Sequence, residues 1–137
     1  MPHLVKPYLF LSAAVLLLVG AFLSFAPEAL YASSGQDLPA AVMIRSDLRA
    51  GGMLLLLSGF FVGAATLNPL SARPALQLSA LVYLGYGLGR IASLAFDGTP
   101  DTTLVAVTGV EWLLGLAAVA LLWRGLPADP KPRVQTA

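Results

Sequence analysis

Four long apolar runs constrain the fold of this chain more than any other feature of its sequence. They cover residues 7–25, 51–67, 74–96 and 104–123. Each is close to the roughly 20 residues that an α-helix needs to cross a hydrocarbon core of about 30 Å. The runs are apolar on all sides, whereas the strands of a membrane barrel alternate apolar and polar residues in shorter segments. The sequence therefore predicts an all-α integral membrane protein, an antiparallel bundle of four transmembrane helices.

The ends of the predicted spans follow from the residues that flank the apolar runs. The second run is short, but the segment "PAAVMIRSDLRA" before it can extend the helix into the headgroup layer. The predicted spans are 7–25, 45–67, 74–96 and 103–124, within one transmembrane domain over 1–126. The remaining residues, 127–137, are rich in proline and are expected to form a disordered cytoplasmic tail. The first run is expected to be a retained signal anchor, with a cleaved signal peptide as the alternative.

Composition excludes several classes of function. The chain is 58% apolar and 11% charged, and it contains no cysteine, so disulfides and thiolate-based metal sites are excluded. His3 is the only histidine, and it precedes the first span, so a bis-histidine haem or a histidine-based metal site within the bundle is excluded. A net charge of +1 without a basic cluster gives no basis for nucleic-acid binding. No metal or cofactor is expected, and the lipid bilayer is the expected partner.

The distribution of basic residues predicts the orientation in the membrane. Two arginines, Arg45 and Arg49, flank the second span on one side. Five basic residues lie on the side of the two termini and the central loop: Lys6, Arg73, Arg124, Lys131 and Arg133. Because basic residues favour the cytoplasmic side, both termini are expected in the cytoplasm. Tyr8 and Trp123 at one end and Tyr31 at the other fit interfacial aromatic belts.

Charged residues inside the third and fourth spans are the main candidates for function. Tyr86, Arg90, Ser93 and Asp97 follow one another at spacings of four, three and four residues, so they share one helical face. The next span carries Glu111. At about 1.5 Å per residue, Arg90 lies roughly 10 Å and Glu111 roughly 15 Å from the outer ends of their helices. Charges at such depth are costly when isolated, so the two are expected to neutralise each other.

Two interpretations of this charge pair stay open. In the first, Arg90 and Glu111 only hold the third helix to the fourth. In the second, they line a polar pocket in the outer leaflet, joined by Arg49, Tyr86, Ser93 and Asp97. Such a pocket would take a lipid headgroup, a small anionic metabolite or a proton-coupled substrate.

Glycines at short spacing predict places where helices pack closely. Small residues allow backbones to approach each other in lipid, where no strong hydrophobic force drives helices together. The glycines assigned to this role are Gly51, Gly52, Gly59, Gly63, Gly85 and Gly89. The first two also follow Arg49, so an alternative is that they leave room for a ligand beside a cation.

Several of these elements together resemble a known family. They are Pro27 after the first span, "RAGG" at 49–52, "GRIASLAFDGTP" at 89–100, and Glu111 in the last span. The chain is similar over roughly 7–124 to a family of small bacterial four-helix membrane proteins catalogued as a domain of unknown function. The resemblance implies a four-helix protein of the bacterial inner membrane and gives weight to Arg49, Arg90, Asp97 and Glu111 as a set. It implies no activity.

Three functions are compatible with these residues. The first is a non-enzymatic accessory or ligand-binding bundle, which could associate with a second copy or another membrane protein. The second is a small proton-coupled transporter that uses Glu111, since a membrane acid is the minimum that such a mechanism needs. The third is a lipid-modifying enzyme. The lack of cysteine, the single histidine and the single deep acid argue against an enzyme.

Overall fold

The structure is a computed structural model, and it describes residues 3–99 and 101–124. Within those residues every regular element is a helix. The elements are α1 (Val5–Phe25), α2 (Pro27–Ser33), α3 (Val42–Ala64), the 3-10 turn η1 (Pro69–Ser71), α4 (Ala72–Phe96) and α5 (Thr102–Trp123). Four of the described helices are long and apolar enough to cross a membrane. The predicted all-α fold with four candidate membrane spans is therefore confirmed.

The long helices begin and end within two residues of the predicted spans except in the second. That span was predicted over 45–67, whereas α3 covers Val42–Ala64. After Ala65, residues 65–67 form a turn, and the Asn68 side chain accepts a hydrogen bond from the backbone N–H of Leu70 to begin η1. Local hydrogen bonding thus ends the helix before its apolar sequence ends. The predicted tail, 127–137, lies outside the described residues.

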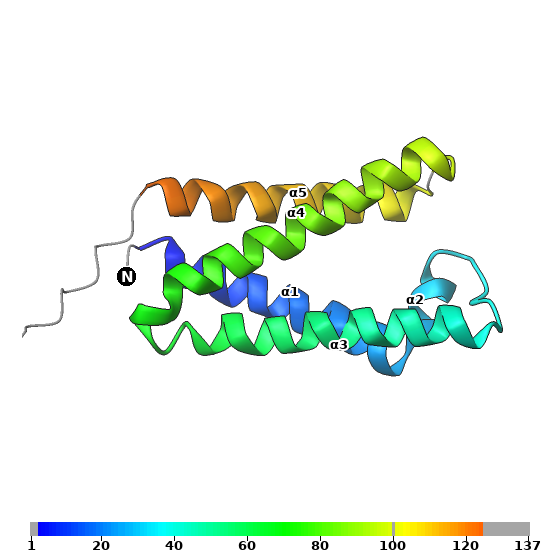
Figure 1. Cartoon of the computed structure of the whole chain (residues 1–137), viewed down its shortest axis with the longest axis horizontal. Helices are drawn as coiled ribbons and strands as arrows, with labels where there is room; N and C mark the ends of the chain where they lie inside the picture. Colours follow the sequence, from blue (N-terminus) through cyan, green and yellow to red (C-terminus); the bar gives the residue numbers. More distant parts are fainter. Residues whose placement is uncertain (1–2, 100, 125–137) are drawn as a thin grey trace, which may run out of the picture.

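The four long helices form two hairpins that meet at one end. α1 packs mainly against α3, and α4 packs mainly against α5 (Figure 1). α1 begins and α5 ends at the same end of the bundle, which we call the N-terminal end; the opposite end is the far end (Figure 1). From the N-terminal end toward the far end, α4 and α5 diverge from α1 and α3 (Figure 1). Contacts between the two hairpins are correspondingly few.

Glycines bring the helices of each hairpin into backbone contact. A Cβ atom added to Gly20 of α1 would lie 2.6 Å from the backbone nitrogen of Leu56 in α3. One on Gly52 would lie 2.7 Å from the backbone nitrogen of Ser24. In the other hairpin, a Cβ on Gly115 would lie 2.6 Å from the Leu84 side chain. Nothing larger than hydrogen fits at Gly20 and Gly52, and a Cβ at Gly115 would require the Leu84 side chain to move, so the helices of each hairpin pack closely.

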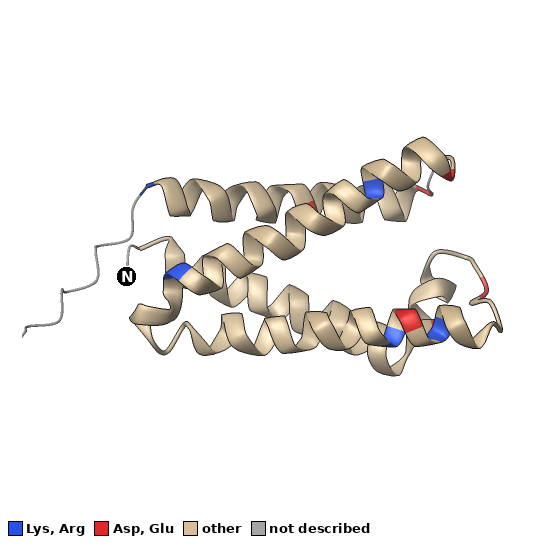
Figure 2. Cartoon of the chain, viewed as in Figure 1, with Lys and Arg blue, Asp and Glu red and all other residues tan. Residues whose placement is uncertain are grey.

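Large apolar side chains lie on the outside of the bundle as well as in its interior. Phe10 is 71% exposed, Leu57 67% and Leu113 69%, while the buried core is built largely from small residues and leucines. A helix that is apolar on all sides suits a hydrocarbon environment. Most charged positions lie toward the ends of the bundle, and most acidic ones lie in the half away from the N-terminal end (Figure 2). This surface suggests contact with a lipid bilayer.

Candidate functional site

The structure brings together the two charges predicted inside the third and fourth spans. Nε of Arg90 in α4 lies 3.6 Å from Oε2 of Glu111 in α5. Both atoms are buried, and neither has a hydrogen-bond partner among the described residues. The Arg90 side chain is 33% exposed and that of Glu111 12%. The pair is thus an electrostatic contact with unused hydrogen-bonding capacity, and its arginine is the more accessible member.

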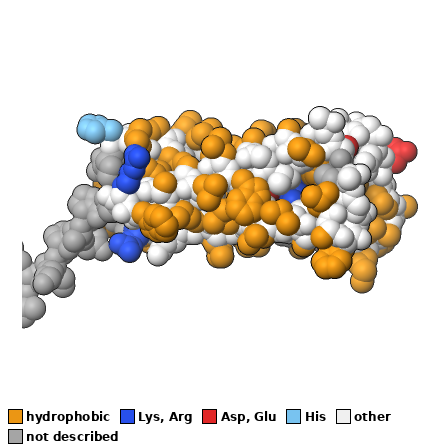
Figure 3. Space-filling view, turned by 90° about the horizontal axis from the view of Figure 1, so that it is seen from above, with side chains coloured by type: hydrophobic (Ala, Val, Ile, Leu, Met, Phe, Trp, Pro, Cys, Tyr) orange, Lys and Arg blue, Asp and Glu red, His pale blue; other side chains and the backbone are white. Residues whose placement is uncertain are grey.

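A groove of about 500 Å³ lies between α3 and α4, where the two hairpins diverge. Its α3 wall consists of Leu54, Leu55 and Ser58. The α4 wall is formed by Leu78, Leu81, Val82, Gly85, Tyr86, Gly89, Arg90 and Ser93. The apolar residues of this wall lie toward the N-terminal end, and the polar ones lie toward the far end. Seen from the side of α4 and α5, a small basic area is surrounded by apolar side chains in the far half of the molecule (Figure 3).

Three of the predicted site residues line this groove. Tyr86, Arg90 and Ser93 share the face of α4 that the sequence spacing predicts. Glu111 does not line the groove, and it contacts Arg90 from α5. The Ser93 hydroxyl donates a hydrogen bond of 2.8 Å to Oδ2 of Asp97.

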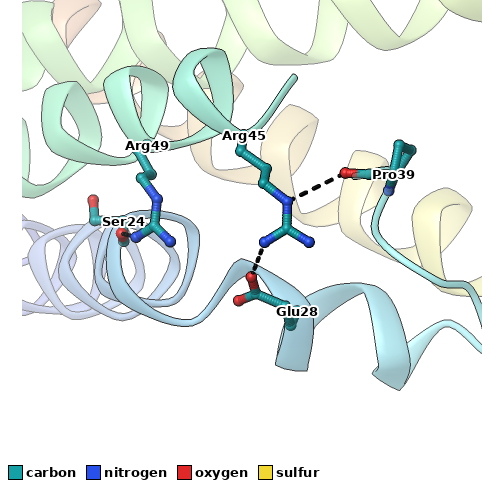
Figure 4. Close-up of polar contacts among 5 residues, drawn as sticks. All are labelled: Ser24, Glu28, Pro39, Arg45 and Arg49. Carbon is teal, nitrogen blue, oxygen red and sulfur yellow. Dashed lines mark hydrogen bonds and ion pairs between the residues drawn. The ribbon is translucent and has the colours of Figure 1, made fainter. Parts of the chain in front are cut away.

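Two other predicted members of the cluster lie elsewhere. Asp97 is exposed at the C-terminal end of α4 and does not line the groove. Arg49 donates a hydrogen bond to the backbone carbonyl of Ser24 near the end of α1 (Figure 4). A helix leaves its last carbonyls without intrahelical partners, and Arg49 satisfies one of them. The nearby Gly51 and Gly52 face Tyr86 and Ser24, so Gly52 is a packing glycine in the α1–α3 contact.

The packing role predicted for Gly85 and Gly89 is wrong. A Cβ added to either would meet no atom within 4 Å, and both glycines line the groove. At Gly59 a Cβ would lie 2.9 Å from the backbone nitrogen of Leu17, so α1 and α3 approach each other closely there. At Gly63 the contact is looser, with the Ala13 Cβ at 3.5 Å. The face of α4 that carries Gly85 and Gly89 looks into open space because the hairpins have already separated at this level.

An ion pair between α2 and the first turn of α3 closes the far end of the α1–α3 hairpin. Arg45 donates one hydrogen bond to the Glu28 carboxylate and another, of 3.3 Å, to the carbonyl of Pro39 (Figure 4). It thus joins α2, the following loop and α3. A hydrogen bond from its own backbone and the charge of Arg45 lower the pKa of Glu28. The pair is exposed, so it contributes to local order and is not part of the groove.

Sequence reasoning missed a buried polar cluster that connects the two hairpins near the N-terminal end. The Tyr8 hydroxyl donates a 2.9 Å hydrogen bond to the carbonyl of Leu114, and the Tyr83 hydroxyl donates one of 2.9 Å to the carbonyl of Ser12. Oγ of Ser12 lies 3.0 Å from Oγ of Ser79. Tyr8 is buried and belongs to this cluster, so its assignment to an interfacial belt is wrong. A signal was present, because each hydroxyl pair is four residues apart on its helix and therefore on one face.

The residues 3–99 and 101–124 contain no group of three histidine, cysteine, aspartate or glutamate side chains that could hold a metal ion. The polar groups that line the groove are the Arg90 guanidinium, the Tyr86 phenol and the hydroxyls of Ser58 and Ser93. Such groups bind and orient an anion through hydrogen bonds.

The fold and the groove define a class of protein: a small four-helix bundle, suited by composition to a membrane, with a cationic groove between two hairpins. Comparison with known families identifies the family to which this protein belongs. The family model described as "Domain of unknown function (DUF4345)" matches residues 4–122, and the chain belongs to this family. No curated protein matches the chain. No solved structure matches it either.

Proposed function

We propose that the protein is a non-enzymatic ligand-binding protein of the bacterial inner membrane, whose groove binds a small anionic group at Arg90. The observation that carries this proposal is the exposure of Arg90. Its side chain is 33% exposed in a groove, although it lies well inside a span. A purely structural ion pair would favour a buried guanidinium with its hydrogen bonds satisfied.

The contact with Glu111 leaves Arg90 able to bind an anion. At 3.6 Å the Nε–Oε2 distance exceeds that of a normal hydrogen bond. A guanidinium has five N–H donors in a planar fork that matches a carboxylate or a phosphate. Ser93 and Tyr86 place two hydroxyl groups on the same wall of the groove. Glu111 offsets the charge of Arg90 when no ligand is bound.

Native mass spectrometry of the gently purified full chain tests the proposal. We expect the wild-type protein to retain an anionic molecule or to bind added glycerol phosphate. Arg90→Gln combined with Glu111→Gln should abolish binding without stranding a buried charge. Arg45→Gln is the matched control, because Arg45 lies outside the groove in the same half of the bundle. Equal binding by all three proteins, or binding by none, would refute the proposed site.

Glu111 supports a second candidate, a proton-coupled transporter. Its Oε2 atom is buried and accepts no hydrogen bond from a described residue, so a bound anion that draws Arg90 away would leave this carboxylate without a counter-charge. A buried carboxylate in that position takes up a proton. Vesicles that contain the protein and a pH-sensitive dye would report proton movement when glycerol phosphate is added. Transport requires that Glu111→Gln abolish this signal, whereas binding alone produces no proton movement across the membrane.

We further propose that both termini are cytoplasmic and that the groove lies in the outer leaflet. The excess of basic residues on the side of the termini supports this orientation. Because the chain has no cysteine, single cysteines can be introduced for labelling with an impermeant thiol reagent. Ser34→Cys and Thr99→Cys should react from outside sealed cells, and Ser71→Cys should react only after permeabilisation. Labelling of Ser71→Cys in sealed cells would reverse the orientation.

A further inference from the structure

The groove has a polar end and an apolar end along a single helix. Arg90 and Ser93 lie toward the far end, while Leu78, Leu81 and Val82 lie toward the N-terminal end. From Leu78 to Arg90 the helix rises about 18 Å at 1.5 Å per residue. That is more than half of a hydrocarbon core of about 30 Å. A small soluble anion would occupy only the polar end and leave the apolar part of the groove unfilled.

The groove is open sideways toward the surface that faces lipid. Leu81 on α4 is 73% exposed and Leu54 on α3 is 62% exposed, so the rims of the groove are not covered by other parts of the protein. Gly85 and Gly89 lie between the apolar and polar ends, and neither has another atom within 4 Å of a Cβ position. The α4 wall of the groove therefore has no side chains at these two positions, which is where the acyl chain of a lipid would join its headgroup. A molecule that already resides in the bilayer can enter without crossing water.

From these features we infer that the groove binds a membrane amphiphile with an anionic headgroup, with one acyl chain along the leucines of α3 and α4 and the head at Arg90. This inference rests on the proposed anion site. The cationic end complements a phosphate or a carboxylate. The rest is lined by apolar side chains and by Ser58, whose hydroxyl already donates a hydrogen bond to the carbonyl of Leu54. The volume of about 500 Å³ lies in the usual range for small-molecule sites.

A protein helix fits the groove less well than an acyl chain. A helix of about 10 Å diameter over the same 18 Å occupies roughly 1,400 Å³. The groove volume of about 500 Å³ is smaller than this, so a helix from a second copy would lie partly outside the groove. An extended acyl chain is narrower and needs no hydrogen-bond partners along its length. The shape therefore favours a lipid over a second copy of the chain.

The test uses Gly85→Leu, which fills the apolar part of the groove and leaves Arg90 in place. Gly109→Leu is the matched control, because Gly109 on α5 also has no atom within 4 Å of a Cβ position and does not line the groove. Delipidated full-length protein in detergent is titrated with phosphatidylglycerol, with phosphatidylcholine and with glycerol phosphate, and bound molecules are counted by native mass spectrometry. Gly85→Leu should weaken phosphatidylglycerol binding about tenfold or more, a loss of about 1.4 kcal/mol, and Gly109→Leu should not.

The outcomes separate this inference from the proposed function. Phosphatidylglycerol should bind better than phosphatidylcholine, and glycerol phosphate should bind more weakly than phosphatidylglycerol. If glycerol phosphate binds equally well and Gly85→Leu has no effect, the anion site stands and the acyl-chain site is refuted. If no probe binds the wild-type protein, both are refuted. A dimeric mass that Gly85→Leu converts to a monomer would place a second copy in the groove and overturn the inference.

Discussion

Removal of the Arg90–Glu111 pair offers a quantitative test of how these two helices are held together. Two unit charges 3.6 Å apart attract by roughly 5 kcal/mol at an effective dielectric constant of about 20. Exposure of Arg90 to the groove screens this attraction. We therefore expect a coupling free energy of about 2–3 kcal/mol in a double-mutant cycle.

The cycle consists of Arg90→Leu, Glu111→Leu and the double variant. Each single variant leaves a charge without its partner, which is the costly step, whereas removal of both charges is nearly neutral. Arg90→Leu should have the larger effect, because the remaining Glu111 side chain is only 12% exposed, whereas the Arg90 side chain that Glu111→Leu leaves is 33% exposed. The free energy of unfolding is measured in mixed micelles by titration with a denaturing detergent.

The same cycle on Arg45 and Glu28 is the control. Their side chains are 35% and 51% exposed, so their coupling should be much smaller than that of the inner pair. If the effects of Arg90→Leu and Glu111→Leu simply add in the double variant, the two residues do not stabilise each other. The proposed role of Glu111 as the resting counter-charge of Arg90 would then be refuted.

Three further measurements test other parts of the structure. Gly20→Ala should lower the free energy of unfolding by about 2 kcal/mol or more, because its Cβ meets the main chain of α3, whereas Gly109→Ala has no contact and should change little. Tyr83→Phe should lower it by about 1 kcal/mol through loss of a buried hydrogen bond to α1, and no change would mean that the bond is absent. The lowered pKa of Glu28 stabilises the fold above its ordinary pKa, and this contribution is lost as the pH falls through the folded-state value. The thermal stabilities of wild-type protein and Glu28→Gln should therefore differ near pH 7 and converge in acid; a constant difference would exclude the ion pair with Arg45 as its source.

The four spans could be predicted from sequence because length and apolar composition determine them almost alone. In a membrane the backbone must satisfy its own hydrogen bonds. A run of about 20 residues that are apolar on all sides therefore forms an α-helix. The contact between Arg90 and Glu111 was also predictable, since both charges lie at similar depth on consecutive helices. These features depend on local sequence and on the bilayer, not on the details of packing.

The groove and the packing contacts could not be predicted in the same way. Gly20 and Gly85 are equally small glycines within apolar runs, yet the first meets backbone and the second meets nothing. Which glycine is packed depends on where the hairpins separate, and that is a property of the assembled bundle. Tyr8 shows the same limit, because its place near a helix end fits an interfacial belt as well as a buried hydrogen bond. Sequence gives the depth of a residue more readily than the direction in which it faces.

The divergence of the two hairpins gives the bundle a wedge-like profile. The polar cluster around Ser12 and Ser79 joins the hairpins near the N-terminal end, and glycine contacts keep each hairpin rigid. The helices within each hairpin thus contact each other more extensively than the two hairpins do. In a bilayer such a shape occupies unequal areas in the two leaflets, so a change in the angle between the hairpins does work against lateral pressure. Lateral pressure in a bilayer would therefore bear on the width of the groove.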